Sequence, residues 1–273
     1  MESIKNNVIL EFQPNPVENL RKKYNMDNGR MEQSLDLLQD WIKKQRHFVS
    51  HDFDREYLER SIICCKGSLE KAKRQTDRIC TLRTLVPKFF ISGDHYPVVS
   101  HTFVSALCEY LKSHDFTDGY LAIIDFRQVN LLEVVRKFNP VDVQQILMVM
   151  IEGYGAVIKG IHMMSHSKVI DLLIKSVKPF LSPKIAERIY VHQENEELYP
   201  IIDRDMLPIE YGGKERSIYE LNEMWFDELT SPKFEAYLAK MAAMCTNESL
   251  RISEKFNEDC IGLPGSFRTL SVD

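Results

Sequence analysis

Three short apolar segments, separated by helical segments, constrain the fold of this chain more than any other feature. The run 120–126 is continuous and too short for a buried helix, so it predicts a strand covered on both faces. Segments 160–164 and 189–192 predict two further strands. Because helices are predicted between them, the alternation indicates parallel strands with right-handed crossovers, an α/β sheet flanked by helices.

A helical module is predicted before this sheet. Apolar residues recur at helical spacing over 31–46 and predict an amphipathic helix; they are Met31, Leu35, Leu38 and Ile42. Asp54 is placed to cap a helix over 54–66, and a third helix runs from about residue 68 until Pro87 ends it.

Further helices are expected around and after the strands. Their ranges are 98–112, 140–152, 167–177, 182–188, 195–204, 217–229 and 232–242. Segment 90–120 contains no convincing strand, and the tail after Thr246 is expected to be less ordered. The predicted organisation is a lead-in over 1–29, a helical module over 30–90, an α/β domain over 91–230, and a helix with a tail over 231–273.

Composition excludes several classes of protein. With 44% hydrophobic and 27% charged residues, the 273-residue chain has ordinary globular values, which argue against a mainly disordered protein. A net charge of −5 argues against a globally basic nucleic-acid binder. No apolar run reaches the length of a membrane span, and no two of the six cysteines have C-x-x-C spacing. A cytoplasmic protein with reduced cysteines is expected.

No constellation of catalytic residues emerges from the sequence. The glycines of 153–160 follow a predicted helix and enter a strand, the reverse of a dinucleotide-binding loop. His162 and His166 are four residues apart, but His162 falls in a predicted strand, which favours a packed histidine over a metal ligand. Asp125 ends a strand without a visible partner base or nucleophile. A non-enzyme without catalytic residues or metal is expected.

Charge is segregated along the second half of the chain. Residues 168–188 carry five basic and two acidic side chains, whereas 191–228 carry eleven acidic and three basic ones. In the basic segment the lysines alternate with apolar residues, as in helices that meet an anionic membrane surface. A core-packed helix with solvated lysines fits the same pattern, and the pattern leaves both readings open.

Three motifs and an upstream helical module, in the same order along the chain, carry a resemblance to a known family. Residues 207–213 read L-P-I-E-Y-G-G, 159–162 read K-G-I-H, and 178–181 read K-P-F-L, followed by Lys184 and Arg188. Upstream, 37–42 and 72–85 resemble the helical module of the same family. Together these segments are similar to the CRAL-TRIO domain family, and most of all to the insect-type relatives of alpha-tocopherol transfer protein and cellular retinaldehyde-binding protein.

The resemblance implies a CRAL-TRIO lipid-binding fold, here with one strand fewer than is usual because segment 90–120 is short. It also implies an apolar pocket between the sheet and a mobile gate helix over 167–177. The implied lining residues are Ile123, Ile124, Phe126, Ile161, Met163, Val169, Ile170, Leu173 and Val177. The implied phosphoinositide-binding residues are Lys178, Lys184 and Arg188.

The function that the resemblance implies is that of an intracellular carrier. It would bind one small hydrophobic lipid, of the retinoid, tocopherol or carotenoid class, and exchange it at phosphoinositide-containing membranes. No cofactor other than this lipid and no nucleic-acid partner is expected, and the protein would be cytoplasmic and peripheral at membranes. The alternative is a phosphoinositide-sensing interaction module whose pocket is collapsed.

Overall fold

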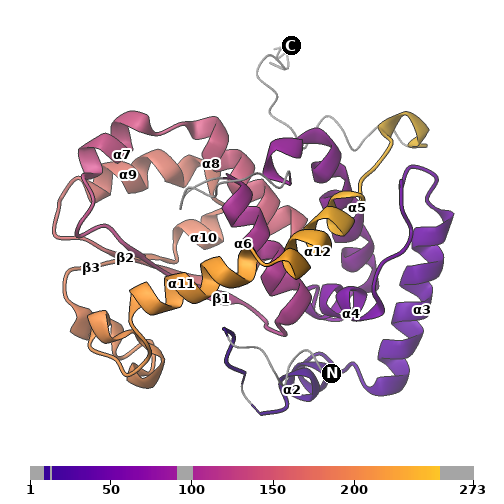
Figure 1. Cartoon of the computed structure of the whole chain (residues 1–273), viewed down its shortest axis with the longest axis horizontal. Helices are drawn as coiled ribbons and strands as arrows, with labels where there is room; N and C mark the ends of the chain where they lie inside the picture. The colour runs from indigo at the N-terminus through magenta and orange to yellow at the C-terminus, as the bar shows by residue number, and fades with distance from the viewer. Residues whose placement is uncertain (1–8, 13, 91–100, 253–273) are drawn as a thin grey trace, which may run out of the picture.

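The computed structural model describes residues 9–12, 14–90 and 101–252 of the chain. A helical part and a small sheet lie side by side, with the sheet on the left of Figure 1 and the first long helices on the right. Segment 98–100 of the helix predicted over 98–112 lies outside the described residues, and the rest forms α6, His101–His114.

The described helical part begins with four helices. The first starts at a proline, and each of the other three has a side-chain N-cap. The four helices are α2 (Pro16–Lys23), α3 (Asn28–Lys44), α4 (Arg55–Cys64) and α5 (Leu69–Leu85). Asp54 accepts a hydrogen bond from the backbone N–H of Glu56, as predicted for an N-cap, and Asp27 and Ser68 cap α3 and α5 in the same way. The three predicted helices of this module are therefore confirmed.

The core of this module draws on residues from far along the chain. The α3 residues Leu35, Leu38 and Ile42 are each at most 1% exposed. Cys108 and Tyr154 belong to the same apolar cluster, together with Met241 near the end of α12 (Pro232–Ala242). Helix α12 therefore completes a core that α3 begins.

Within the described residues, a parallel sheet of three strands lies beside the module, in the order β1-β2-β3. The strands are β1 (Tyr120–Asp125), β2 (Ile158–Met164) and β3 (Ile189–His192). All three predicted strands and their parallel arrangement are confirmed, and with them the α/β fold class.

Helical segments make both crossovers. The first contains α7 (Leu131–Lys137), α8 (Pro140–Leu147) and a π-helical turn, η2 (Met148–Gly153); the second contains α9 (Ile170–Val177), η3 (Lys178–Phe180) and α10 (Pro183–Ala186). The single helix predicted over 140–152 is thus divided at Met148, where the backbone changes from α-helical to π-helical bonding. The helix predicted over 167–177 begins three residues later than expected.

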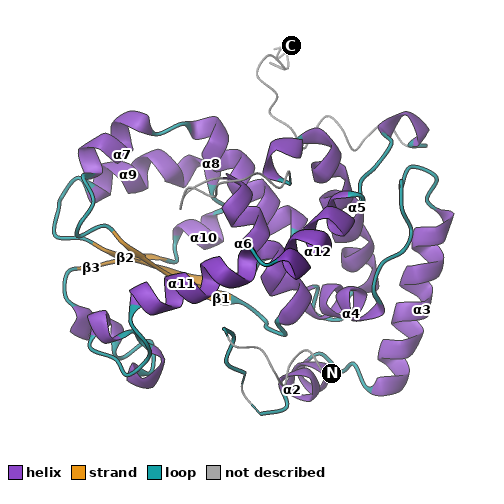
Figure 2. Cartoon of the chain, viewed as in Figure 1, coloured by secondary structure: helices purple, strands orange, loops and turns teal. Residues whose placement is uncertain are grey.

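The helix predicted over 195–204 is wrong. Short 3₁₀ turns occupy this stretch and the next one instead: η4 (Asn195–Leu198), η5 (Arg204–Met206) and η6 (Ile209–Tyr211). Pro200 has no backbone N–H to continue a helix, and Asp203 starts a new turn by accepting a bond from the N–H of Asp205. The helix predicted next is confirmed as α11 (Ile218–Leu229). Figure 2 shows the strands with α7, α8, α9 and α10 above them and with α11 and short helical turns below.

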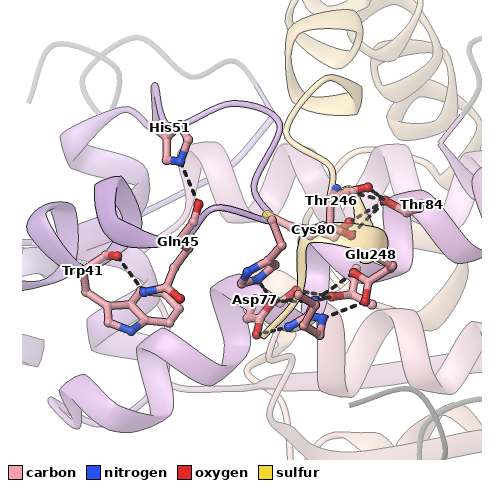
Figure 3. Close-up of polar contacts among 11 residues, drawn as sticks. Trp41, Gln45, His51, Asp77, Cys80, Thr84, Thr246 and Glu248 are labelled. Atoms are coloured by element: carbon pink, nitrogen blue, oxygen red, sulfur yellow. Dashed lines mark hydrogen bonds and ion pairs between the residues drawn. The ribbon is translucent and has the colours of Figure 1, made fainter. Parts of the chain in front are cut away.

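The segment after Thr246 is not loose over its described part. Thr246 forms an antiparallel bridge with Phe48, and its backbone N–H donates to Thr84 Oγ1 on α5. The short turn η7 (Glu248–Leu250) follows, and Figure 3 shows Thr246 and Glu248 against α5. The expectation of a less ordered tail is therefore wrong up to residue 252; residues 253–273 lie outside the described residues.

Candidate functional site

Helix α9 lies against one face of the sheet. Its apolar residues recur at helical spacing, so one side of the helix is continuously apolar: Ile170, Leu173, Ile174 and Val177. Ile170 and Leu173 are buried and belong to one apolar cluster with Met163 of β2. The face of β2 that carries Met163 is consequently the face that α9 covers.

Most residues predicted to line a pocket do come together at this place. One apolar cluster contains seven of them: Phe126, Ile161, Met163, Val169, Ile170, Leu173 and Val177. Ile124 pairs in register with Met163, so its side chain points to the same face of the sheet, where it is 38% exposed. Eight of the nine residues therefore lie on one side.

Ile123 points to the opposite face. It pairs in register with His162 and packs with Met164, Leu198 and Leu207, away from α9. Neighbouring residues of a strand alternate between faces, so Ile123 and Ile124 cannot both face one compartment. The structure does not bring Ile123 together with the other predicted lining residues.

Helix α7 contributes apolar side chains that the sequence analysis did not single out. Leu131, Val134, Val135 and Phe138 belong to the same cluster as Leu173, and Ile189 joins them from β3. The signal was present in the sequence, since three α7 residues and Phe138, directly after the helix, follow the spacing i, i+3, i+4, i+7. The apolar site is thus bounded by the sheet, α7 and α9.

The apolar residues here are covered less completely than those of the helical module. In the cluster only Leu131, Met163, Ile170 and Leu173 are buried, and the others are half-buried. On the outside, Leu132 of α7 and Leu172 of α9 are 53% and 50% exposed. This side of the molecule presents apolar surface that the described chain does not cover.

Basic side chains lie on α9 and in the segment that follows it. Lys178 and Lys184 are exposed, and among the described residues neither forms an ion pair with a carboxylate. Lys175 on α9 is exposed in the same way. Arg188 differs, because its guanidinium is half-buried and donates to the backbone carbonyl of Ile158 at the start of β2. Arg188 therefore links the start of β3 to the start of β2, whereas the lysines are free to bind an anionic group.

The segment L-P-I-E-Y-G-G forms a structural joint on the other face of the sheet. The backbone N–H of Ile218 donates to Glu210, with both carboxylate oxygens 3.0 Å away, which fixes the start of α11. Gly212 has a φ of 73°, and a Cβ on Gly213 would lie 1.8 Å from the carbonyl oxygen of Leu207. The signature residues thus position α11 relative to the sheet.

The polar residues near the strand ends are engaged with one another. Arg127 donates to both carboxylate oxygens of Asp125, with its Nη2 2.7 Å from Oδ2, and to Asn195. His162 Nδ1 lies 2.9 Å from His192 Nε2, and burial together with this neighbour lowers the pKa of His162. Within 9–12, 14–90 and 101–252, no group of His, Cys, Asp or Glu has the arrangement of a metal site.

Comparison with known proteins identifies the family. A sequence model of the CRAL/TRIO domain matches residues 43–213, from the end of α3 to the glycines of the signature segment. This is more than half of the chain. The chain belongs to the CRAL/TRIO domain family. The family membership agrees with the helical module, the parallel sheet and the joint before α11.

Named CRAL/TRIO relatives match shorter stretches. A human protein named "Alpha-tocopherol transfer protein-like" is 28% identical over 155 residues, which cover 55% of this chain and 45% of that protein. Clavesin-1 of Xenopus laevis is 33% identical over 101 residues, which cover 35% of this chain and 29% of that protein. The matches thus span less than half the length of these relatives. In the described part of this CRAL/TRIO chain, no helix has the length and apolar character needed to cross a bilayer.

Proposed function

We propose that this chain is a carrier that binds one small hydrophobic lipid against the sheet, α7 and α9 and exchanges it at phosphoinositide-containing membranes. The ligand class is that of a retinoid, tocopherol or carotenoid. The observation that carries the proposal is the half-buried apolar surface around Leu173 and Ile124, in a CRAL/TRIO domain related to a protein named for tocopherol transfer.

Burial of the ligand supplies the free energy of binding. A lipid of about twenty carbons gains roughly 0.8 kcal/mol per buried methylene, or about 16 kcal/mol in total. The loss of translational and rotational freedom and the ordering of side chains subtract much of this gain. The remainder still makes release into water slow, so efficient release requires a membrane and an opening of the site.

The position of the lysines supports exchange at an anionic surface. Lys175 of α9 is exposed, and so are Lys178 and Lys184 in the segment that follows α9; Leu172 of α9 also faces solvent. Each basic residue near an anionic membrane contributes about 1 kcal/mol, so three of them favour transient docking without permanent anchoring. Contact of this side with a membrane places α9 directly at the lipid surface, where its displacement would open the site.

The carrier proposal is tested by lipid uptake. Delipidated protein is incubated with retinal, α-tocopherol or β-carotene, and bound lipid per chain is measured by solvent extraction and mass spectrometry. We expect one lipid per chain, with strongly reduced uptake by Leu173→Asp and by Ile124→Glu. Ile124 is 38% exposed, so its substitution tests the site without placing a charge in a closed core.

A control for Ile124→Glu is Leu37→Asp on α3, because Leu37 is also exposed, at 50%, but lies far from the sheet in sequence and belongs to the helical module. We expect Leu37→Asp to bind lipid normally. Uptake that Ile124→Glu and Leu173→Asp leave unchanged, in folded protein, would contradict the assigned site.

A second candidate is a phosphoinositide-sensing module with a collapsed pocket. The observation in its favour is that Met163, Ile170 and Leu173 bury one another with the protein's own side chains. This function predicts binding to vesicles that contain a phosphoinositide, loss of that binding in Lys178→Glu/Lys184→Glu, and no lipid in the extracted protein. Extractable lipid at one per chain decides against it.

A further inference from the structure

A region on the sheet face opposite to α9 combines exposed apolar side chains with negative charge. This acidic loop region comprises residues 194–220, that is η4, η5, η6 and the first residues of α11. It forms the orange turns at the lower left of Figure 1, while α9 lies at the upper left, beyond the sheet. The proposed lipid site and its lysines do not use any of these residues.

The acidic loop region is held in a defined conformation. Leu198, Leu207 and Tyr211 are buried together with Met164 of β2, which attaches the turns to the sheet. The backbone N–H of Lys214 donates to the carbonyl of Arg204 at 3.0 Å, and the N–H of Glu215 donates to that of Leu207 at 3.0 Å. Its surface is therefore a preformed platform.

Large apolar side chains project from this platform into solvent. Tyr219, Met206 and Ile209 are 71%, 69% and 59% exposed, and Ile201 and Ile218 are 41% and 42% exposed. The Glu210 carboxylate lies 3.0 Å from the backbone nitrogen of Ile218, so η6 and the start of α11 adjoin. Single exposed apolar residues are normal, but a group of them rimmed by charges marks an interaction surface.

The rim is negatively charged. The region contains eight acidic and three basic side chains, and all three basic ones are engaged. Lys214 pairs with Asp205 at 2.7 Å, Arg216 pairs with Glu215 at 2.8 Å, and Arg204 donates to the carbonyl of Gly212 at 2.8 Å. An anionic membrane is repelled by such a surface, whereas a partner with lysine or arginine is attracted to it.

We propose that the acidic loop region is a docking surface for a protein partner that presents a basic amphipathic helix. The apolar side of that helix contacts Met206, Ile209 and Tyr219, and its cations meet the surrounding carboxylates. Because the region and α9 lie on opposite faces of the sheet, a docked partner leaves α9 free. The chain can hold this partner and meet a membrane at the same time.

The test uses a short amphipathic helix of leucine and lysine as the probe, titrated into the full chain and followed by NMR or calorimetry. We expect saturable binding that weakens with salt, and about tenfold or greater loss in Met206→Ser/Ile209→Ser/Tyr219→Ser, which keeps every charge. Leu37→Ser removes an exposed apolar residue elsewhere and should bind the peptide normally. All three positions are mostly exposed, so the triple variant is expected to fold, and circular dichroism checks this.

Three outcomes would overturn the proposal. One is unchanged peptide binding by the folded triple variant, which would reduce the contact to charge alone. Another is equal binding of the matching leucine–glutamate peptide. The third is concentration-dependent self-association in sedimentation equilibrium that the triple variant abolishes, which would make a second copy of this chain the occupant. Lipid uptake is measured separately, so failure here leaves the carrier proposal intact.

Discussion

Arg251 donates to both carboxylate oxygens of Asp77, 174 residues earlier in the chain, at 2.8 and 3.0 Å. His47 Nε2 also lies 2.9 Å from Asp77 Oδ1. The side chains of His47, Asp77 and Arg251 are each at most 11% exposed. Figure 3 shows Glu248, from the C-terminal segment, beside Asp77 of α5. The described C-terminal segment is thus bound to the middle of the helical module by a buried ion pair.

Arg251→Met should strongly destabilise the protein. The substitution leaves the Asp77 carboxylate buried without its main counterion, and breaking a buried pair from one side costs about 3–5 kcal/mol. The measurement is the free energy of unfolding from urea denaturation. Arg55→Met is the control, because Arg55 pairs with Glu32 and Asp36 on the surface and should cost less than about 1 kcal/mol. Equal losses for the two variants would contradict the interpretation.

Two tyrosines that bond the same buried carboxylate should differ in their effect. Tyr154 Oη donates to Glu109 at 2.8 Å and Tyr237 Oη donates to it at 3.3 Å, while Arg83 pairs with it at 2.8 Å. Tyr154→Phe should cost about 1.5–3 kcal/mol of unfolding free energy, the range for bonds to charged groups. Tyr237→Phe should cost less because its bond is longer. Chemical denaturation measures both losses. A larger loss for Tyr237→Phe than for Tyr154→Phe would show that the hydrogen-bond distances do not reflect the strengths of the two bonds.

Asp115 should make the protein less stable as the pH rises. Burial raises the pKa of its carboxyl group to about 6, above the value of about 3.9 in an unfolded chain. Folding therefore favours the protonated form, so the unfolding free energy should fall between about pH 4 and pH 6, by about 2–3 kcal/mol. Asp115→Asn should remove this fall and be more stable than the parent protein at neutral pH, as measured by denaturation across that range.

Asp118 provides a control of opposite sign for the pH experiment. The hydrogen bond from Lys23 lowers the pKa of its carboxyl group. Its contribution to stability is present above the unfolded pKa and is lost as the pH falls through the folded pKa. Asp118→Asn should therefore lower stability at neutral pH. A gain in stability from this variant would contradict the stabilising role assigned to the bond between Lys23 and Asp118.

Gly213→Ala should displace the signature segment. The added Cβ would lie 1.8 Å from the backbone oxygen of Leu207, which cannot move aside as a side chain could. We expect a loss on the order of 3 kcal/mol, the cost of forced backbone shifts in a packed structure. Gly29→Ala in α3 is the matched control and should be neutral or stabilising, since its nearest neighbour would be 3.4 Å away and alanine favours the helix. Similar melting temperatures for the two variants would contradict this role of Gly213.

Much of the fold is predictable from local sequence signals. The spacing of Leu35, Leu38 and Ile42 predicts α3, Asp54 predicts the start of α4, and the length of the run at 120–126 predicts β1. These signals depend on neighbouring residues alone. The order of the strands follows from their alternation with helices, because right-handed crossovers permit few other arrangements.

The features that could not be predicted depend on the register of strand pairing and on contacts between residues far apart in the sequence. The face of Ile123 is fixed by the pairing of β1 with β2, which contains a shift between Tyr120 and Leu121. The bond between Tyr154 and Glu109 joins residues 45 positions apart, and the bond between Arg251 and Asp77 joins residues 174 positions apart. No local sequence pattern predicts either bond. The lining contributed by α7 was visible as a helical pattern, but its position against α9 was not.

The bond between Arg251 and Asp77 also bears on synthesis of the protein. While the chain is being translated, α5 leaves the ribosome long before residue 251 exists. During that interval Asp77 has no arginine to neutralise it, and Met241 and Met244 are missing from the bundle. Until residue 251 is synthesised, the core of the helical module is therefore incomplete and its apolar side chains are more exposed. Chaperones that recognise apolar segments can bind the nascent chain in this interval.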